Sequence, residues 1–559
     1  MSHSTRIIAT LTGWLLTHGA STAQVTLEKL QTIPHPGPVF GSEFGERLAV
    51  GDANGDGHFD LAASDAIALN YMGQGWVMYG PDFLSAVKVN VPGLVPGDLF
   101  GFGVWVLGDI DGDGADDLLA GAQQSKNGGT AEGAGKAFVS RGPGFQSTIE
   151  LATPNFGLSP TPFFGASGAI ADVTGDGVPD VVVGSPKWNP PQLFAPGRID
   201  VFSGLALQSA PVVTITGSGA QEQFGGYIVV ADRNGDGMAD IATNQYWPVP
   251  SNVTWLHGSS FTESYTAPSP ALFGPGVMRF EDMDLDGVGD LVVATSASKG
   301  AVVIFDGPLY ATHTVLNNPS GQTNALFGIG MDIGDVDRDG FPDIVVSAMV
   351  DDVSGLLNDA GRAWIFFGPD HATTQLVGEG DLPKAYYGAD VAVRDLDHDG
   401  FAEVFVSQRF DATGGRVMVY GHRTLRALAP RTVSIANGGS VPMALEAGPL
   451  SAGRNYLVML SVSGTDPGTD IPFRGDVVHL PLNIDAATQT GLAITNSALL
   501  SGFLGVLDAQ GSAGPTLALP PGLVPAVLFG TPLTFAAVVD GPSGAIEFAS
   551  HAVEVTFVH

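Results

Sequence analysis

The feature that most constrains this chain is an acidic nine-residue segment that occurs seven times. Successive copies begin 50 to 63 residues apart. Self-similarity at a period of this length indicates a repeat architecture, in which each copy belongs to one structural unit. The copies, called here the first to seventh acidic loops, are DANGDGHFD from Asp52, DIDGDGADD from Asp109, DVTGDGVPD from Asp172, DRNGDGMAD from Asp232, DMDLDGVGD from Asp282, DVDRDGFPD from Asp335 and DLDHDGFAE from Asp395.

Short β-branched runs follow each acidic loop and predict strands. Examples are VVVGS from Val181 and LVVAT from Leu291, and a second run often ends in Gly-Pro, as in WVMYGP up to Pro81. Helical periodicity is almost absent from these units, and each unit has room for four short strands. Four-stranded units repeated seven times favour a β-propeller, because ring closure leaves only short, protected strand edges. The predicted fold class is therefore all-β, with a seven-bladed propeller.

An aromatic-glycine pair lies about eight residues before most acidic loops. These pairs are Phe44-Gly45, Phe100-Gly101, Phe164-Gly165, Phe224-Gly225, Phe273-Gly274, Phe327-Gly328 and Tyr387-Gly388. Together with the acidic loops they resemble FG-GAP repeats, the units of the integrin α-subunit propeller and of many secreted bacterial proteins. The resemblance covers residues 25 to about 421. It implies that a calcium ion in each loop fixes the hairpin between the first and second strands of a blade.

The spacing D-x-[DN]-x-D-G-x-x-D is suited to an oxygen-coordinated cation. It places oxygen ligands at positions 1, 3, 5 and 9, with a backbone carbonyl expected at position 7 and a glycine at position 6 for the sharp turn. Several carboxylates in one short loop repel each other without a cation. A flexible all-oxygen site favours Ca²⁺ over Mg²⁺, and the lack of thiolates argues against Zn²⁺. We therefore predict up to seven bound Ca²⁺.

The candidate ligands follow from this spacing in all seven loops. They are Asp52, Asn54, Asp56, His58 (through its carbonyl) and Asp60; Asp109, Asp111, Asp113 and Asp117; Asp172, Thr174, Asp176 and Asp180; Asp232, Asn234, Asp236 and Asp240; Asp282, Asp284, Asp286 and Asp290; Asp335, Asp337, Asp339 and Asp343; and Asp395, Asp397, Asp399 and Glu403.

Three of the loops depart from the common pattern, and the pattern has two alternative interpretations. The third loop has a neutral Thr174 at position 3, the fifth has Leu285 at position 4, and the seventh ends in the longer Glu403. Each motif taken alone could instead be a solvated acidic turn that binds nothing. An EF-hand does not fit, because it needs flanking helices and a glutamate at position 12.

Composition narrows the classes of partner and chemistry. The 559 residues carry a net charge of −34, which disfavours nucleic acid and anionic membranes as partners. With 44% hydrophobic residues the chain should fold. It has no cysteine, which excludes disulfides, thiol catalysis and thiolate metal sites.

The chain divides into three predicted segments. Residues 1–23 have the basic residue, short apolar stretch and small terminal residues of an export signal, and ten apolar residues are too few for a membrane span. Residues 24–424 form the propeller, whose last blade lacks an outer strand that VTLEKLQTI at 25–33 can supply. Residues 429–559 contain further strand patterns and predict a second all-β domain, with a sandwich as the expected form.

These patterns predict a secreted or cell-surface protein without a membrane span in its mature form. The chain has no G-x-S-x-G and no H-E-x-x-H motif. We therefore expect a non-catalytic binding or adhesion module that binds an extracellular protein or glycan. By resemblance to integrin α-subunits, the partner would bind the face opposite the acidic loops, which carries the long loops 123–135, 187–198, 244–252 and 349–361. The alternative is an extracellular hydrolase or lyase acting on polysaccharide or phospholipid.

Overall fold

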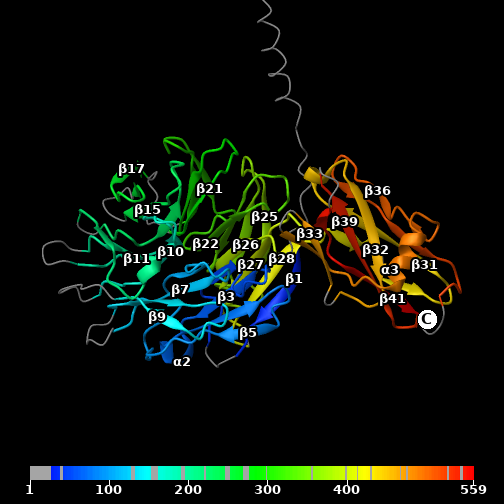
Figure 1. Ribbon diagram of the computed structural model, residues 1–559, viewed down its shortest axis with the longest axis horizontal. Coiled ribbons are helices and arrows are strands. Elements are labelled where there is room, and N and C mark those ends of the chain that lie inside the picture. The colour runs from blue at the N-terminus through cyan, green and yellow to red at the C-terminus, as the bar shows by residue number, and fades with distance from the viewer. Residues whose placement is uncertain are drawn as a thin grey trace, which may run out of the picture.

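The computed structural model describes a defined part of the chain. The described residues are 27–559 apart from 38–41, 127–132, 153–160, 190–194, 220–221, 246–251, 269–275, 297–298, 354–356, 397–398, 412, 429–430, 466–467, 474–475, 525–527 and 542–545. The predicted export signal, Asp397, the Phe273-Gly274 pair and parts of the four long loops lie outside these residues. The described part is nearly all β (Figure 1).

Seven four-stranded antiparallel sheets account for residues 27–422 of the described chain. In six of them the strands pair in chain order. The first three sheets are β2 (Leu48–Gly51), β3 (Asp60–Asp65), β4 (Gln74–Tyr79) and β5 (Ser85–Lys88); β6 (Trp105–Gly108), β7 (Asp117–Ala122), β8 (Lys136–Ser140) and β9 (Thr148–Glu150); and β10 (Ser167–Ala171), β11 (Asp180–Ser185), β12 (Arg198–Phe202) and β13 (Val213–Thr216).

The next three sheets repeat this order, and the seventh departs from it. They are β14 (Ile228–Ala231), β15 (Asp240–Gln245), β16 (Asn252–Leu256) and β17 (Glu263–Pro268); β18 (Met278–Glu281), β19 (Asp290–Thr295), β20 (Ala301–Phe305) and β21 (His313–Asn317); β22 (Phe327–Gly334), β23 (Asp343–Ala348), β24 (Arg362–Phe366) and β25 (Thr374–Glu379); and β26 (Tyr387–Arg394), β27 (Glu403–Gln408), β28 (Arg416–His422) and β1 (Leu27–Pro34). The short helices α2 (Ala68–Tyr71) and η2 (Gly204–Ala206) lie between strands.

The N-terminal strand completes the last of these sheets. β1 pairs antiparallel with β28, from Leu27 opposite His422 to Pro34 opposite Arg416. Figure 1 shows blue β1 beside yellow β28. From Leu27 onward, this pairing confirms the prediction that the N-terminus supplies the missing outer strand.

The sheets contact one another in a closed cycle. The first strands touch in the order β2, β6, β10, β14, β18, β22 and β26, and β26 touches β2 again. The aromatic-glycine pairs join neighbouring sheets: Phe100 bridges Gly73 of the preceding sheet, and Phe44 bridges Gly415 of the last one. A Cβ at Gly73 would lie 2.2 Å from the Phe100 carbonyl oxygen, so only glycine fits there. This closed arrangement is consistent with a β-propeller.

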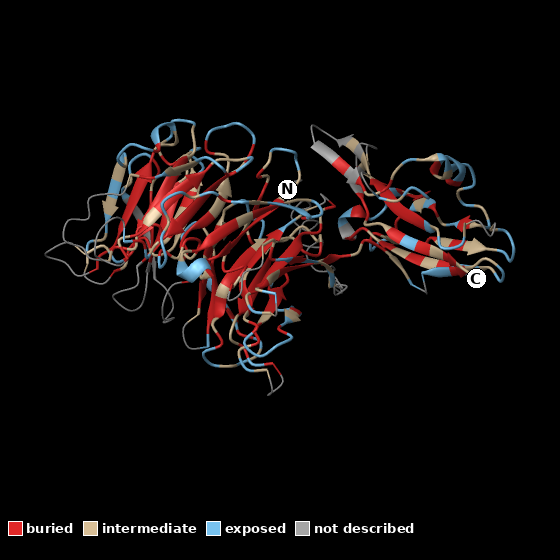
Figure 2. Cartoon of the chain, turned by 90° about the horizontal axis from the view of Figure 1, so that it is seen from below, coloured by how far each residue is buried: buried red, intermediate tan, exposed pale blue. Residues whose placement is uncertain are grey.

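The β-branched runs form strands that are buried on both faces. Every residue of β3, β7, β11, β19, β23 and β27 is buried (Figure 2). The hydrophobic clusters lie between neighbouring sheets, and one of them joins Ile33, Phe405 and Val417 of the seventh sheet to Leu48 and Leu61 of the first. Burial on both faces explains why these runs lack the alternation of half-exposed strands.

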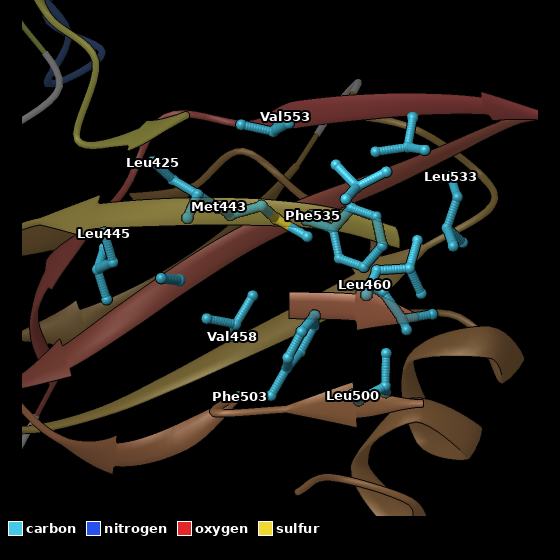
Figure 3. Close-up of a cluster of buried hydrophobic side chains, with 14 of the residues drawn as sticks. Leu425, Met443, Leu445, Val458, Leu460, Leu500, Phe503, Leu533, Phe535 and Val553 are labelled. Carbon is cyan, nitrogen blue, oxygen red and sulfur yellow. The ribbon is translucent and has the colours of Figure 1, made fainter. Parts of the chain in front are cut away.

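The strands after residue 424 form a separate group with its own apolar cluster. Phe503 and Phe535 lie in this cluster with Leu425, Val458 and Val553 (Figure 3). One sheet has the order β29-β31-β38-β35 with β37 on β31, another has β30-β41-β39-β32-β36 with β40 on β39, and β33 pairs with β34. The elements are β29 (Leu425–Ala427), β30 (Thr432–Ser434), β31 (Gly439–Glu446), η3 (Pro449–Ser451), β32 (Asn455–Ser461), β33 (Thr469–Phe473), β34 (Asp476–Leu480), α3 (Ala486–Ala493), β35 (Leu500–Ser501), β36 (Leu504–Val506), β37 (Ser512–Ala513), β38 (Thr516–Leu519), β39 (Pro532–Asp540), β40 (Ile546–Ala549) and β41 (Val553–Val558).

The packing of β1, in the seventh sheet, against the first sheet predicts how substitutions in this strand change the stability of the protein. Ile33 is 1% exposed and packs against the first and seventh sheets, whereas its neighbour Thr32 is exposed. We expect Ile33→Ala to cost about 3 kcal/mol, because it leaves a cavity between these sheets. Thr32→Ala should change stability by less than ~0.5 kcal/mol. Urea unfolding followed by tryptophan fluorescence measures both, and equal midpoints for the two variants would contradict the closure.

Candidate metal centres

Each acidic loop joins the first strand of its sheet to the second. The position-9 residue is the first residue of that second strand in all seven sheets. This places the loops at equivalent points of the sheets, as the sequence spacing predicts. The position-9 residues are Asp60, Asp117, Asp180, Asp240, Asp290, Asp343 and Glu403.

The position-1 carboxylate folds the loop around itself. In the first loop, Asp52 Oδ1 accepts N–H groups from Gly55 at 2.7 Å and Asp56 at 3.1 Å, and Oδ2 accepts from Gly57 at 2.9 Å. Gly55 and Gly57 have φ of 74° and 86°, a left-handed conformation that glycine adopts at little cost. An ionised carboxylate has about four lone-pair sites. Asp52 therefore retains acceptor capacity for a cation.

The same turn forms where position 4 is not glycine. In the fifth loop, Asp282 accepts from Asp286 N at 3.1 Å and Gly287 N at 2.8 Å, although Leu285 has a φ of 59°. Arg338 at position 4 of the sixth loop likewise has a φ of 56°. The departure of the fifth loop from the common sequence therefore leaves its backbone turn in place.

The position-9 carboxylate ties the loop to the end of the third strand. Asp60 is fully buried, and its two oxygens accept N–H groups from Ala53 at 3.0 Å and Gly80 at 2.7 Å. Asp290 and Asp343 make the equivalent pair of bonds in their sheets. At Gly80 a Cβ would lie 2.1 Å from the Phe59 carbonyl oxygen, so glycine is required. The nine-residue motif does not predict this contact; the glycine that repeatedly follows the third strand is the sequence signal for it.

Three loops bring three carboxylates within reach of one ion among the described residues. In each group one oxygen per residue lies within 4.8 Å of the others. The groups are Asp109, Asp111 and Asp113; Asp282, Asp284 and Asp290; and Asp335, Asp337 and Asp339.

The remaining loops have fewer carboxylates at positions 3 and 5 or are only partly described. The first and fourth carry Asn54 and Asn234 at position 3, and both amide oxygens accept the N–H of the following aspartate. In the third loop, Thr174 donates its N–H to Asp180 at 2.9 Å. His58 donates its N–H to Asp56 at 2.9 Å, and the role of its carbonyl as a ligand stays a prediction.

Burial makes ionisation of several loop carboxyls unfavourable. Desolvation raises the pKa of Asp60 to about 7. Desolvation and the nearby Asp337 raise the pKa of Asp343 to about 8. The pKa of Asp337 itself rises to about 7, through burial and then through Asp339 and Asp335. A divalent cation among these oxygens would favour their ionised form, so the donor chemistry fits Ca²⁺.

Neighbouring loops are joined to each other by backbone hydrogen bonds. The N–H of Asp116, at position 8 of the second loop, donates to the Asp52 carbonyl of the first loop at 2.7 Å. The same bond runs from Ala239 to Asp172 at 3.0 Å and from Ala402 to Asp335 at 2.8 Å. Among the described residues these bonds join the first loop to the second, the third to the fourth, and the sixth to the seventh.

The sixth and seventh loops contact the C-terminal strands. Arg338 donates to the Ala447 carbonyl at 2.6 Å and to Ser451 Oγ at 2.9 Å. His551 Nδ1 lies 3.8 Å from Asp399 Oδ2, and Asp399 is fully buried. These contacts explain why the carboxyls of these two loops are less exposed than those of the first loops.

Comparisons with known proteins agree with the repeats. Residues 109–183 match the FG-GAP-like repeat family, and residues 327–366 match the FG-GAP repeat family. The chain is 26% identical over 217 residues to integrin alpha-5 of Xenopus laevis, a match that covers 33% of this chain and 20% of the integrin. It is 29% identical over 149 residues to phosphatidylinositol-glycan-specific phospholipase D of Rattus norvegicus, covering 24% of this chain and 18% of that protein.

The matched segments thus span about a fifth of each relative. Among solved structures, this chain matches the extracellular domain of a hybrid two-component system of B. thetaiotaomicron. The match covers 95% of this chain and 59% of that chain. Its identity is 10% and its TM-score 0.41, too low to support an argument about the fold. The family matches, the integrin similarity and the repeated loops agree, and the chain is an FG-GAP repeat protein.

Proposed function

We propose that residues 24–424 form a seven-bladed β-propeller and that residues 429–559 form a second, sandwich-like domain. The closed cycle of first-strand contacts and the pairing of β1 with β28 support the propeller. The separate apolar cluster of Phe503 and Phe535 supports the second domain. Residues 1–23 are proposed to direct export. No helix in the described part of the chain is long and apolar enough to cross a membrane.

The acidic loops are proposed to bind Ca²⁺, in up to seven sites. The observation that carries this proposal is the convergence of Asp282, Asp284 and Asp290 in the fifth loop. Positions 1 and 9 are already held by backbone N–H groups, so a cation would meet ligands that are fixed in place. All-oxygen ligands at this spacing are the ligands that Ca²⁺ prefers. The bound ions would stabilise the hairpin between the first two strands of each blade.

The propeller is proposed to be a non-catalytic binding or adhesion module, secreted or at the cell surface. The similarity to integrin alpha-5 supports an extracellular protein or glycan as the partner. Seven similar structural metal sites distributed around a ring do not resemble a single active site. The partner would bind the face opposite the acidic loops, where the longer loops lie. Glycan-array and cell-surface binding by the purified protein tests this function directly.

An enzymatic role is the second candidate, because the chain resembles a phosphatidylinositol-glycan-specific phospholipase D over 24% of its length. In this case the chain would act as an extracellular hydrolase or lyase on phospholipid or polysaccharide. Incubation with glycosylated phosphatidylinositol and with polysaccharides separates the two candidates. Release of product without saturable binding to cells or glycans would favour the enzyme.

Removal of calcium should destabilise the protein. Each site saturated at 100 times its Kd adds ~2.7 kcal/mol to the folded state, so several sites together should raise Tm by at least about 10 °C. Scanning calorimetry in chelator and then in excess Ca²⁺ measures this difference, with equimolar Mg²⁺ as the control. The same Tm in chelator and in calcium would rule out structural calcium.

Substitution of one exposed candidate ligand tests calcium binding without disturbing the fold. Asp284 is exposed, so Asp284→Ala should cost less than ~0.5 kcal/mol in chelator. In calcium we expect the variant to bind one ion fewer than the unmodified protein, measured by equilibrium dialysis. Glu554→Ala, which removes an exposed carboxylate from β41, should bind the full number. Equal ion counts for all three proteins would show that the fifth loop holds no calcium.

A further inference from the structure

The residue before the glycine that ends the third strand lies beside the acidic loop of its own sheet. In the first, second, fourth, fifth and sixth sheets that glycine donates its N–H to the position-9 carboxylate, for example at 3.0 Å from Gly142 to Asp117 and 2.7 Å from Gly307 to Asp290. The bond fixes the preceding residue next to the loop. Its identity changes from sheet to sheet: Tyr79, Arg141, Ser203, His257, Asp306 and Phe367.

In the second sheet this residue is a cation that contacts two candidate calcium ligands. Arg141 Nη1 lies 3.0 Å from Asp111 Oδ2 at position 3, and it donates a hydrogen bond to Asp117 Oδ2 at position 9. Asp117 is buried, and the Arg141 side chain is 20% exposed. The backbone of Arg141 is held as well, because its N–H donates to the Ser147 carbonyl at 2.8 Å. One guanidinium nitrogen therefore bridges carboxylates from both ends of the loop.

This arrangement conflicts with a calcium ion in the same loop. A Ca²⁺ coordinated by positions 3 and 9 would lie within a few ångströms of the guanidinium, and like charges at that distance repel strongly in a partly buried site. Arginine also stays charged at any pH the protein meets, so the repulsion cannot be relieved by deprotonation. Calcium would have to displace the guanidinium from both carboxylates.

The fifth loop provides a matched comparison within the same chain. The second and fifth loops both have aspartate at positions 1, 3, 5 and 9. The residue beside the fifth loop is Asp306, which is negative rather than positive; burial raises the pKa of Asp290, and the charges of Asp284 and Asp306 add to this rise. The arginines inside two other loops are directed to neighbouring elements: Arg233 donates to Tyr310 and Pro308, and Arg338 to Ala447 and Ser451.

We propose that Arg141 takes the place of the cation in the second acidic loop, which therefore binds no Ca²⁺ when the fifth loop is saturated. The inference rests on the proposed calcium function and limits it, because it leaves at most six calcium sites. In the second blade, the hairpin between the first two strands would then be held by Arg141 and not by a metal ion. A guanidinium that bridges Asp111 and Asp117 supplies the positive charge that the other loops would take from solution.

Calcium counts by equilibrium dialysis test the proposal in matched variants of the full chain. Arg141→Gln should bind one Ca²⁺ more than the unmodified protein. Arg416→Gln removes the same charge from β28, where Arg416 pairs with Asp381, and should leave the count unchanged. Asp111→Ala and Asp284→Ala remove the position-3 ligand of the second and fifth loops. Asp111→Ala should leave the count unchanged, whereas Asp284→Ala should lower it by one.

Each outcome bears on the proposal. A count that falls by one in Asp111→Ala overturns it, even if Arg141→Gln does not fold, because the second loop would then hold calcium beside the arginine. Equal counts for Arg141→Gln and the unmodified protein overturn it too. In both cases the other loops still bind, and the proposed calcium function stands. If neither the unmodified protein nor the Arg141→Gln variant binds calcium, the proposed calcium function fails together with the inference.

Discussion

Carboxylates that accept backbone N–H groups hold the repeated part of this protein together. At position 1 of a loop, as in Asp52, one side chain gathers the N–H groups of the turn that follows it. At position 9, as in Asp60, a buried side chain connects the loop to the end of the third strand. Bonds from charged groups are stronger than neutral ones, and a buried N–H left without a partner is costly. A nearby cation would favour the ionised form of these carboxylates and so strengthen the bonds that they accept.

The repeat pattern made most of the architecture predictable from sequence. The in-phase acidic loops and the β-branched runs indicated four strands per unit, and the free outer-strand pattern at the N-terminus indicated that β1 would pair with the last sheet. The strand pattern after residue 424 indicated further sheets but not their order. In β29-β31-β38-β35, strands far apart in the chain are neighbours, and local patterns carry no information on such pairings.

The individual character of each loop could not be predicted in the same way. The contact of Arg141 with Asp111 joins residues 30 positions apart, and it depends on how the third strand ends beside the loop. Arg338 and Ala447 are more than a hundred positions apart in the chain, and only the packed structure brings them together. The nine-residue motif is similar in all seven copies, whereas the side chains around it differ. The motif therefore predicts a site in every copy, and under the proposal for Arg141 the surrounding side chains would decide which copies bind a metal.

The net charge of −34 is unevenly distributed over the molecule. A large part of the acidic side chains belongs to the loops, where they fold the backbone and face one another, so the charge is concentrated at one edge of the ring of sheets. The C-terminal part of the chain covers part of that edge, where Ala447 accepts a hydrogen bond from Arg338 of the sixth loop and His551 lies near Asp399 of the seventh.

Anomalous diffraction from crystals of the protein grown in Ca²⁺ would show whether the acidic loops bind calcium. We expect an anomalous peak in the fifth loop, at about 2.3–2.6 Å from oxygens of Asp282, Asp284, Asp286 and Asp290. Water or no density at that position, in a crystal with millimolar calcium, would show that this loop does not bind calcium.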